Sequence, residues 1–399
     1  MLKDLIRVGV ISLGLCSSGL SFAYGLDLPM SLNQTKTIFQ EDWTKRINLS
    51  GLLMGELILS NYNQSASGRF SDKRSYQTFC FPRANLNVDA EINDWSKVHM
   101  TFNFRSSCGY GGKNDEWAFA NFGTTSESYV DLGNAEVANY TGRIGFQYLP
   151  YGAYTRNTIP ASLSQLLTQS QVAGASGFAK LSENFDLAAF IFSGKKKRND
   201  SIKIRNFGAQ VFGDFALYTA KIKATVGYMY NIAGGVNFLY YESSSSTANA
   251  LQNGYRKRVP GLSATIDAEF LDDWSINFRY TGAFERFDAL DVSWSNHGAK
   301  PKAFVFGGAK ELEVKMFDSE LNSRIAASYQ ISKEAVNVRG IGLGRGLPKR
   351  RLQLGYILEL NKYFETGIHF ISDKDYVVSE GGTNRSSFTT LLSMSLNVA

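Results

Sequence analysis

The residues of this sequence with the clearest chemical potential are charged side chains that recur at alternate positions. Arg83, Lys97, Arg105 and Arg143 fall on the polar side of alternating stretches, together with acidic residues. Rings of charged side chains inside a pore set its ion preference. The sequence has 3 histidines and contains no H-E-x-x-H motif, no G-x-S-x-G motif and no Cys–His cluster. We therefore expect no catalytic site, no metal site and no cofactor.

The stretch 80–105 indicates how these charges are positioned. Even positions are apolar from 80 to 92, and odd positions are mostly polar or charged. The alternation resumes after Asn93-Asp94-Trp95 and continues to 105. A period of two predicts strands. Soluble strands average about 5–6 residues, whereas a membrane-spanning strand needs about 9–11, apolar toward lipid and polar toward a wet interior. The pattern favours a transmembrane barrel.

A three-residue turn at 93–95 predicts the register of this hairpin. Residue numbers of a pair then sum to 188, so Leu86 faces Phe102 and Cys80 faces Cys108. Opposed cysteines in an antiparallel pair can lie within reach of a disulfide. The alternative is a pair of reduced thiols on the lipid-facing rim.

The predicted interior face carries both signs of charge. Its basic residues are Arg83, Lys97, Arg105, Arg143, Lys221, Lys223 and Arg279, and its acidic residues are Glu56, Asp89, Glu91, Asp267, Glu269 and Glu359. One interpretation is a weakly anion-favouring constriction near Arg83, Lys97, Arg105 and Arg143, with Gln147 on the same face as Arg143. The other is a mixed ladder of charges that keeps the interior wet. We also expect His99 and His369 to face the interior, and their spacing in the sequence indicates neither a serine nor a carboxylate partner.

Alternating stretches predict sixteen antiparallel strands in an all-β transmembrane barrel. They are 47–60, the hairpin 79–108, 126–134, 141–149, 170–180, 184–194, 202–213, 216–231, the hairpin 261–285, 304–317, 321–332, 350–361, 364–373 and 386–398. Connections after even-numbered strands are short, and most of those after odd-numbered strands are long and polar. Short periplasmic turns and long extracellular loops give this rhythm.

The amino terminus predicts export. Lys3 and Arg7 precede an apolar run, and small residues flank Phe22 in Ser21-Phe22-Ala23, as in a secretory signal peptide. We expect a signal peptide at 1–23, a periplasmic segment at 24–45, a barrel at 46–399, and location in a Gram-negative outer membrane. Cleavage leaves Cys80 and Cys108 as an even pair in an oxidising compartment. Hydrophobic residues make up 44% of the 399-residue chain, yet no run approaches the ~20 of a membrane helix.

Two loops are predicted to make contacts beyond the barrel wall. Residues 150–169 form the third outer loop, with a possible helical turn at 161–168. The run 195–198 either binds lipopolysaccharide phosphates or is a solvated loop. Expected partners are membrane lipid, lipopolysaccharide, a small solute and, in a homotrimer or other homo-oligomer, further copies of the chain; no nucleic acid is expected.

The residues around 142–163 carry a family resemblance. Gly142-Arg143, Gln147-Tyr148-Leu149-Pro150-Tyr151-Gly152 and Asn157-Thr158-Ile159-Pro160-Ala161-Ser162-Leu163 resemble the signature of the LbtU-type siderophore porins, Gram-negative outer-membrane barrels linked to uptake of iron–siderophore complexes. Tyr151 stands where that family usually has phenylalanine, and Ile159 where it has an acidic residue. The resemblance implies that Arg143 and a constriction loop containing Tyr151, Tyr154, Arg156 and Ile159 shape the pore.

Three functions remain open at this point. The leading one is a channel for small solutes, with iron–siderophore complexes as the substrate that the resemblance implies. A second is a general, weakly anion-preferring diffusion porin. A third is a surface adhesin that uses the long outer loops, above all 232–260.

Overall fold

The computed structural model describes most of the chain from residue 46 onward. The described residues are 46–61, 63–65, 68–72, 76–105, 121–134, 138–152, 162–193, 206–234, 255–270, 273–316, 319–336 and 347–398. The chain divides into two units, Met1–Arg46 and Ile47–Ala399, and all but one of these residues belong to the second.

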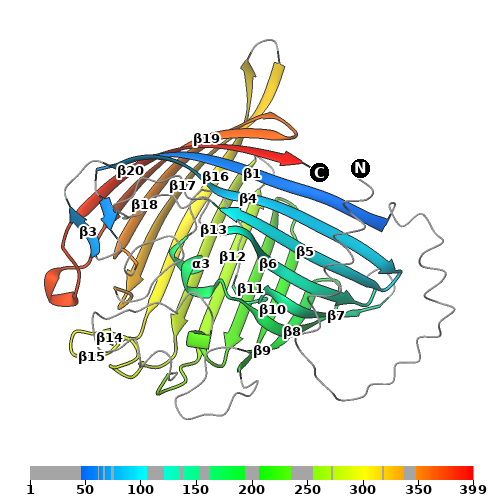
Figure 1. The fold of residues 1–399 in the computed structure, drawn as a ribbon, viewed down its shortest axis with the longest axis horizontal. Helices are drawn as coiled ribbons and strands as arrows, with labels where there is room; N and C mark the ends of the chain where they lie inside the picture. The colour runs from blue at the N-terminus through cyan, green and yellow to red at the C-terminus, as the bar shows by residue number, and fades with distance from the viewer. Residues whose placement is uncertain are drawn as a thin grey trace. The chain divides into compact units, whose positions relative to one another are not determined.

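Sixteen strands close into one antiparallel barrel (Figure 1). Their order around the barrel follows their order in the chain, and pairing of the first with the last closes the sheet. The barrel strands are β1 (Ile47–Ser60), β4 (Tyr76–Asn93), β5 (Ser96–Arg105), β6 (Asn121–Leu132), β7 (Tyr140–Tyr148), β8 (Gln171–Lys180), β9 (Phe185–Phe192), β10 (Asn206–Ala216), β11 (Ala220–Met229), β12 (Gly261–Phe270), β13 (Trp274–Ala283), β16 (Lys302–Met316), β17 (Ser319–Lys333), β18 (Arg350–Asn361), β19 (Phe364–Lys374) and β20 (Ser386–Val398). This confirms the predicted fold class.

Short elements lie in the connections at one end of the barrel strands. They are the hairpins β2 (Asn63–Ser65) with β3 (Gly68–Asp72) and β14 (Ser293–Trp294) with β15 (His297–Gly298), the helix α3 (Leu163–Thr168), and the 3-10 turns η3 (Ile232–Gly234) and η5 (Val378–Glu380). Connections at the other end are short, as between β4 and β5. Among the described residues, no helix is long and apolar enough to cross a membrane.

The two faces of the barrel wall differ in polarity as the sequence predicts. In β18, Leu352 and Leu354 are 45% and 47% exposed, whereas their neighbours Arg351 and Gln353 are buried. Phe306 of β16 is 60% exposed on the same outer face. Because a strand places successive side chains on opposite faces, one alternating sequence supplies both an apolar exterior and a polar interior.

The hairpin register is confirmed where the structure describes it. Leu86 pairs with Phe102, at the predicted sum of 188. The β1–β4 register shifts between Met54 and Glu56, where Phe81 and Pro82 lie opposite a single residue. Proline has no N–H for the ladder and is tolerated at bulges. Beyond this bulge the odd-numbered Phe79 is 48% exposed, so odd positions there lie on the outer face.

Two further sequence predictions concern residues at the limits of the described chain. The pairing of Cys80 with Cys108 stays a prediction, because Cys108 lies outside the described residues. The predicted start of the fourth strand at 126 is wrong, because β6 begins at Asn121, where it pairs with Arg105 of β5.

The β16–β17 hairpin extends past its neighbours (Figure 1). β13 pairs with β16 only as far as Lys310, and β18 joins β17 only from Ser323, while β16 and β17 pair with each other to the end of the hairpin. An ion pair of 3.3 Å between Lys315 and Glu320 joins the two strands of this extension.

Candidate functional site

The segment between β7 and β8, here called the crossing segment, has described residues on two walls of the barrel. Its two ends lie together, because Leu149 N–H donates to the Ser170 carbonyl at 2.9 Å. Its last part, α3, contacts β13, β16 and β17. β17 stands eight strands from β7 in either direction around the sixteen-stranded barrel. A segment that leaves at β7 and contacts β17 must therefore reach the opposite wall, and Figure 1 shows α3 in front of these strands.

The first anchor of this crossing segment is a glycine held by a buried amide. Gly152 N–H donates to Gln210 Oε1 at 2.7 Å, and Gln210 Nε2 donates back to the Gly152 carbonyl at 3.4 Å. Gly152 has φ +85°, and a Cβ there would lie 2.7 Å from the Thr168 hydroxyl. Only glycine meets both the conformation and the space without strain.

Tyr151 packs beside this anchor, against the inner wall. Its side chain is 0% exposed and belongs to an apolar cluster with Leu149, Val172, Phe190, Phe192 and Met229. A Cβ on Gly261 would lie 2.9 Å from its hydroxyl oxygen. Tyr151, predicted to shape the constriction, thus holds the segment to the wall and does not face open space.

The second anchor is α3 itself. Ser162 caps the helix by accepting the Gln165 N–H at 3.2 Å. The Leu163 N–H, left without a partner by the first helical turn, donates to Gln330 Oε1 of β17 at 2.8 Å. All six residues of α3 are buried. The predicted helical turn at 161–168 is confirmed over Leu163–Thr168.

Connections from around the barrel surround α3 with apolar side chains. Besides Leu163, Leu166 and Leu167, the cluster contains Ile232, Ala233, Tyr255 and Val259 between β11 and β12, Ala283, Phe287, Val292, Ala299 and Ala303 from β13 to β16, and Ala335 and Leu347 between β17 and β18. This cluster, the α3 cluster, fixes α3 in one position.

A loop carboxylate outside the barrel strands holds one border of the α3 cluster. Asp291 accepts the N–H groups of Arg256 and Lys257 at 2.9 and 3.2 Å, next to the buried Tyr255. Burial raises the pKa of the Asp291 carboxyl, and the two backbone N–H groups oppose that rise. Burial, followed by the nearby Asp291, also raises the pKa of Tyr255.

The interior faces of β4 to β7 carry a continuous polar network. Arg143 makes a bidentate ion pair with Asp131, at 2.7 and 3.1 Å, and its guanidinium carbon lies 3.9 Å from the centre of the Tyr129 ring. The His99 ring stacks on Tyr129 at 4.7 Å, and its Nδ1 lies 2.6 Å from the Asp89 carboxylate. Charge-assisted bidentate pairs are among the stronger polar contacts.

Both histidines have polar partners that their spacing in the sequence did not indicate. His99 has the carboxylate of Asp89, and the register sum of 188 already places those two residues opposite each other. The buried His369 Nε2 lies 3.4 Å from the Ser393 hydroxyl on the next strand.

The structure brings some of the predicted site residues together and separates others. Arg143, Lys97, Asp89 and Glu91 share the β4–β7 wall, where Lys97 forms a 2.7 Å ion pair with Glu91. Gln147 is fully buried and donates to the Gly174 carbonyl at 3.2 Å.

The remaining predicted residues lie elsewhere or outside the description. Glu56 is buried on β1, on the far side of β4 from this network. Arg83 and Arg105 lie in β4 and β5, but their side chains, and all of Tyr154, Arg156 and Ile159, lie outside the described residues. Among the described residues, no group of His, Cys, Asp and Glu is placed to hold a metal ion.

Comparison with known proteins identifies the architecture. No protein-family model and no curated protein matches the sequence. Solved structures match by fold. OprB of Pseudomonas putida matches with a TM-score of 0.58 and 8% identity over 91% of this chain and 96% of that one. The outer membrane channel DcaP of Acinetobacter baumannii matches with a TM-score of 0.54 and 12% identity over 88% of this chain and 96% of that one. An anion-selective porin from Comamonas acidovorans matches with 0.52 and 10% identity over 88% of this chain and 99% of that one.

The chain has the fold of the outer-membrane porins. In this porin fold the apolar side chains face outward, so the interior wall and the crossing segment are the surfaces that a polar solute would meet. The shared architecture assigns no particular solute.

Proposed function

We propose that this protein is an outer-membrane channel that passes small polar solutes through its barrel. The observation that carries the proposal is the contrast between the two faces of a closed wall. Outside, apolar side chains such as Phe306 and Leu354 are exposed; inside, ion pairs such as Arg143–Asp131 line the wall. An apolar outer face is stable in contact with lipid, and a polar inner face is stable in contact with water.

Two tryptophans support a membrane boundary at the short turns. Trp95 is the last residue of the β4–β5 turn and Trp274 is the first residue of β13; they are 59% and 49% exposed. Lys310 Nζ lies 4.9 Å from the centre of the Trp274 ring. Tryptophan is enriched where membrane meets water. We place the short turns in the periplasm, the connection that holds α3 on the outer side, and residues 1–23 in a cleaved signal peptide.

The solute is the finer part of the proposal. Iron–siderophore complexes are the leading candidate, because the resembling residues 147–152 and 157–163 belong to or adjoin the crossing segment. The ion selectivity we propose is weak, because Lys97 and Arg143 are each paired with a carboxylate. A basic residue that is paired with a carboxylate produces a weaker electrostatic potential at a passing ion than an isolated basic residue does.

Planar-bilayer recording on the purified protein tests these statements. A channel gives steady conductance, and its reversal potential in a salt gradient measures selectivity. Block of the current by a ferric siderophore, added at increasing concentration, supports the siderophore assignment, and steady current without block supports a general diffusion porin. A protein that inserts but never conducts refutes the channel. Deletion of outer-loop residues 235–254 that abolishes cell attachment without changing conductance would favour the adhesin.

A further inference from the structure

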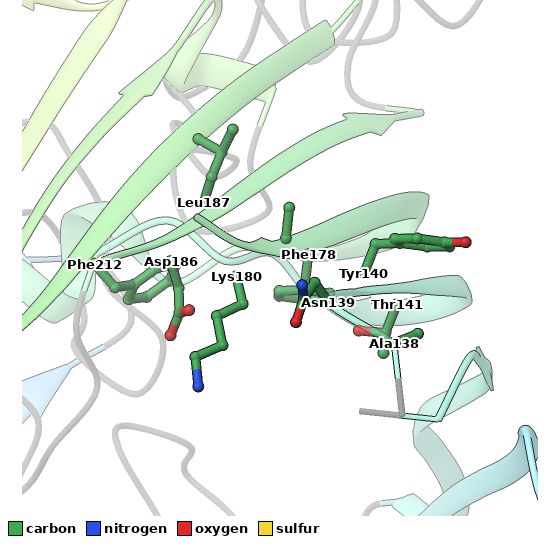
Figure 2. Close-up of a pocket in the computed structure, with 10 residues that line it drawn as sticks. Ala138, Asn139, Tyr140, Thr141, Phe178, Lys180, Asp186, Leu187 and Phe212 are labelled. Atoms are coloured by element: carbon green, nitrogen blue, oxygen red, sulfur yellow. The ribbon is translucent and has the colours of Figure 1, made fainter. Parts of the chain in front are cut away.

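A pocket on the interior wall near the short turns has no role in the function proposed above. It has a volume of about 390 Å3, within the range of small-molecule sites. Its wall comes from β8, β9 and β10, from the start of β7 and from the turn that precedes β7. Figure 2 shows Lys180, Asp186 and Phe212 on one side of these strands, with Leu187 on the other.

Register explains why these side chains converge. Lys180 pairs with Asp186, and Asp186 pairs with Phe212, so the three lie in one row across neighbouring strands. Phe178 stands two residues before Lys180 on the same face, opposite the small Ala188. The rings of Phe178 and Phe212 therefore flank a part of the wall where the side chains are small, and the charged Lys180 and Asp186 lie beside them.

The pocket belongs to the same interior surface as the polar network. The guanidinium carbon of Arg143 lies 6.0 Å from the centre of the Phe178 ring. A solute that follows the β4–β7 wall therefore comes within reach of the pocket.

The charges of the pocket are available to a ligand. Some oppositely charged residues that face each other in the register are joined, as Arg143 is to Asp131 and Arg351 to Asp373 at 2.7 Å. Within the part of the chain that the structure describes, Lys180 and Asp186 face each other without forming an ion pair. Both side chains are exposed, so the attraction between them is weak in water and either can bind a ligand group instead.

We propose that this pocket binds small zwitterions that carry an apolar ring, such as an aromatic amino acid. Lys180 Nζ donates to the carboxylate of the ligand, Asp186 accepts from its ammonium group, and the ring lies between Phe178 and Phe212. Each part of the ligand meets one part of the pocket, so a compound that lacks one charge or the ring loses one set of contacts. This inference rests on the proposed channel function, because it names a class of solute that would bind in the pocket while passing through the channel.

Equilibrium dialysis of labelled probes against the folded full chain in detergent micelles tests the proposal. The probes are L-phenylalanine, glycine, 3-phenylpropionate and phenethylamine, which differ in one charge or in the ring. L-Phenylalanine is expected to bind about tenfold more tightly than each of the others, because a charged hydrogen bond contributes at least that factor and burial of the ring contributes a similar one. Equal binding of all four probes would overturn the proposal.

Variants locate the site. Lys180→Gln, Asp186→Asn and Phe212→Ala are each expected to weaken L-phenylalanine binding about tenfold. The matched control is Lys221→Gln with Glu269→Gln, an opposed charged pair on β11 and β12 outside the pocket, which is expected to change nothing. An equal loss in the control would place the binding elsewhere and refute the site.

Bilayer recording on the same preparation separates the two proposals. Selective binding without conductance leaves the site standing and removes the channel. Conductance without discrimination among the probes leaves the channel and removes the site.

Discussion

Leucine truncation in α3 tests whether the crossing segment limits the pore. Leu163 and Leu167 are 0% and 2% exposed within the α3 cluster. Replacing a buried leucine by alanine costs about 2–5 kcal/mol. Three leucines therefore stabilise docking by about 6–15 kcal/mol, and the hydrogen bond to Gln330 adds about 1 kcal/mol.

Ordering the helix opposes this stabilisation. Fixing the backbone of its six residues costs about 6–12 kcal/mol. The two sides nearly balance, so the loss of about 4–10 kcal/mol in the double variant Leu163→Ala/Leu167→Ala exceeds the net docking energy. We expect α3 to leave the wall formed by β13, β16 and β17.

Single-channel recording measures the result. The double variant is expected to show a larger and noisier conductance than the parent, because the interior is no longer crossed by an ordered segment. The matched control is Leu352→Ala/Leu354→Ala, which removes leucines from the exposed outer face and leaves the interior unchanged. A double variant that folds, loses α3 from the wall and conducts as the parent does would show that the segment does not narrow the path.

Three further predictions concern polar contacts. Gln210→Leu leaves the Gly152 N–H unpaired and should cost about 1–3 kcal/mol, measured as faster hydrogen exchange at Gly152. Arg143→Gln should shift the reversal potential toward cation preference and Asp131→Asn toward anion preference, because each frees the opposite charge; shifts of the same sign would contradict the pairing. The pKa of Asp291 is raised, so its carboxyl group holds a proton more tightly in the folded loop than in the unfolded loop. Loop stability should therefore fall as pH rises from the ordinary pKa of 3.8 through the raised pKa. Hydrogen exchange at the backbone N–H groups of Arg256 and Lys257, which donate to Asp291, measures this loss of stability. Asp291→Asn should remove its dependence on pH.

Strand alternation made the barrel predictable from the sequence, and its exceptions have local causes. The 86–102 pairing follows from a period of two and a short turn, both of which are visible in the residues. The bulge at Pro82 arises where β4 pairs with β1, and the sequence of β4 alone does not show which strand is its partner. The first residues of β6 alternate poorly in the sequence, and pairing with β5 makes them a strand.

The candidate site could be predicted only in part, because barrel closure decides which strands face each other. Alternation places Arg143 and Asp89 on one interior face, and the register adds His99 opposite Asp89. Nothing in the sequence near 163 indicates that its partner is Gln330, a contact that exists only when the barrel is complete. Gln210 gives only a weak signal in the sequence, because Asn206 is a second amide on the same face of β10.

The seam between β1 and β20 has a consequence for assembly. Gly51 pairs with Val398, so the strand made first finds its second neighbour only when the strand made last is available. Until then both strands present a row of unsatisfied backbone groups, and the contact that ends this exposure spans almost the whole polypeptide, which makes it slow to find. A circular permutant that links the two strands by a short peptide and opens the chain at another turn should mature faster, while a chain truncated within β20 should remain an open sheet.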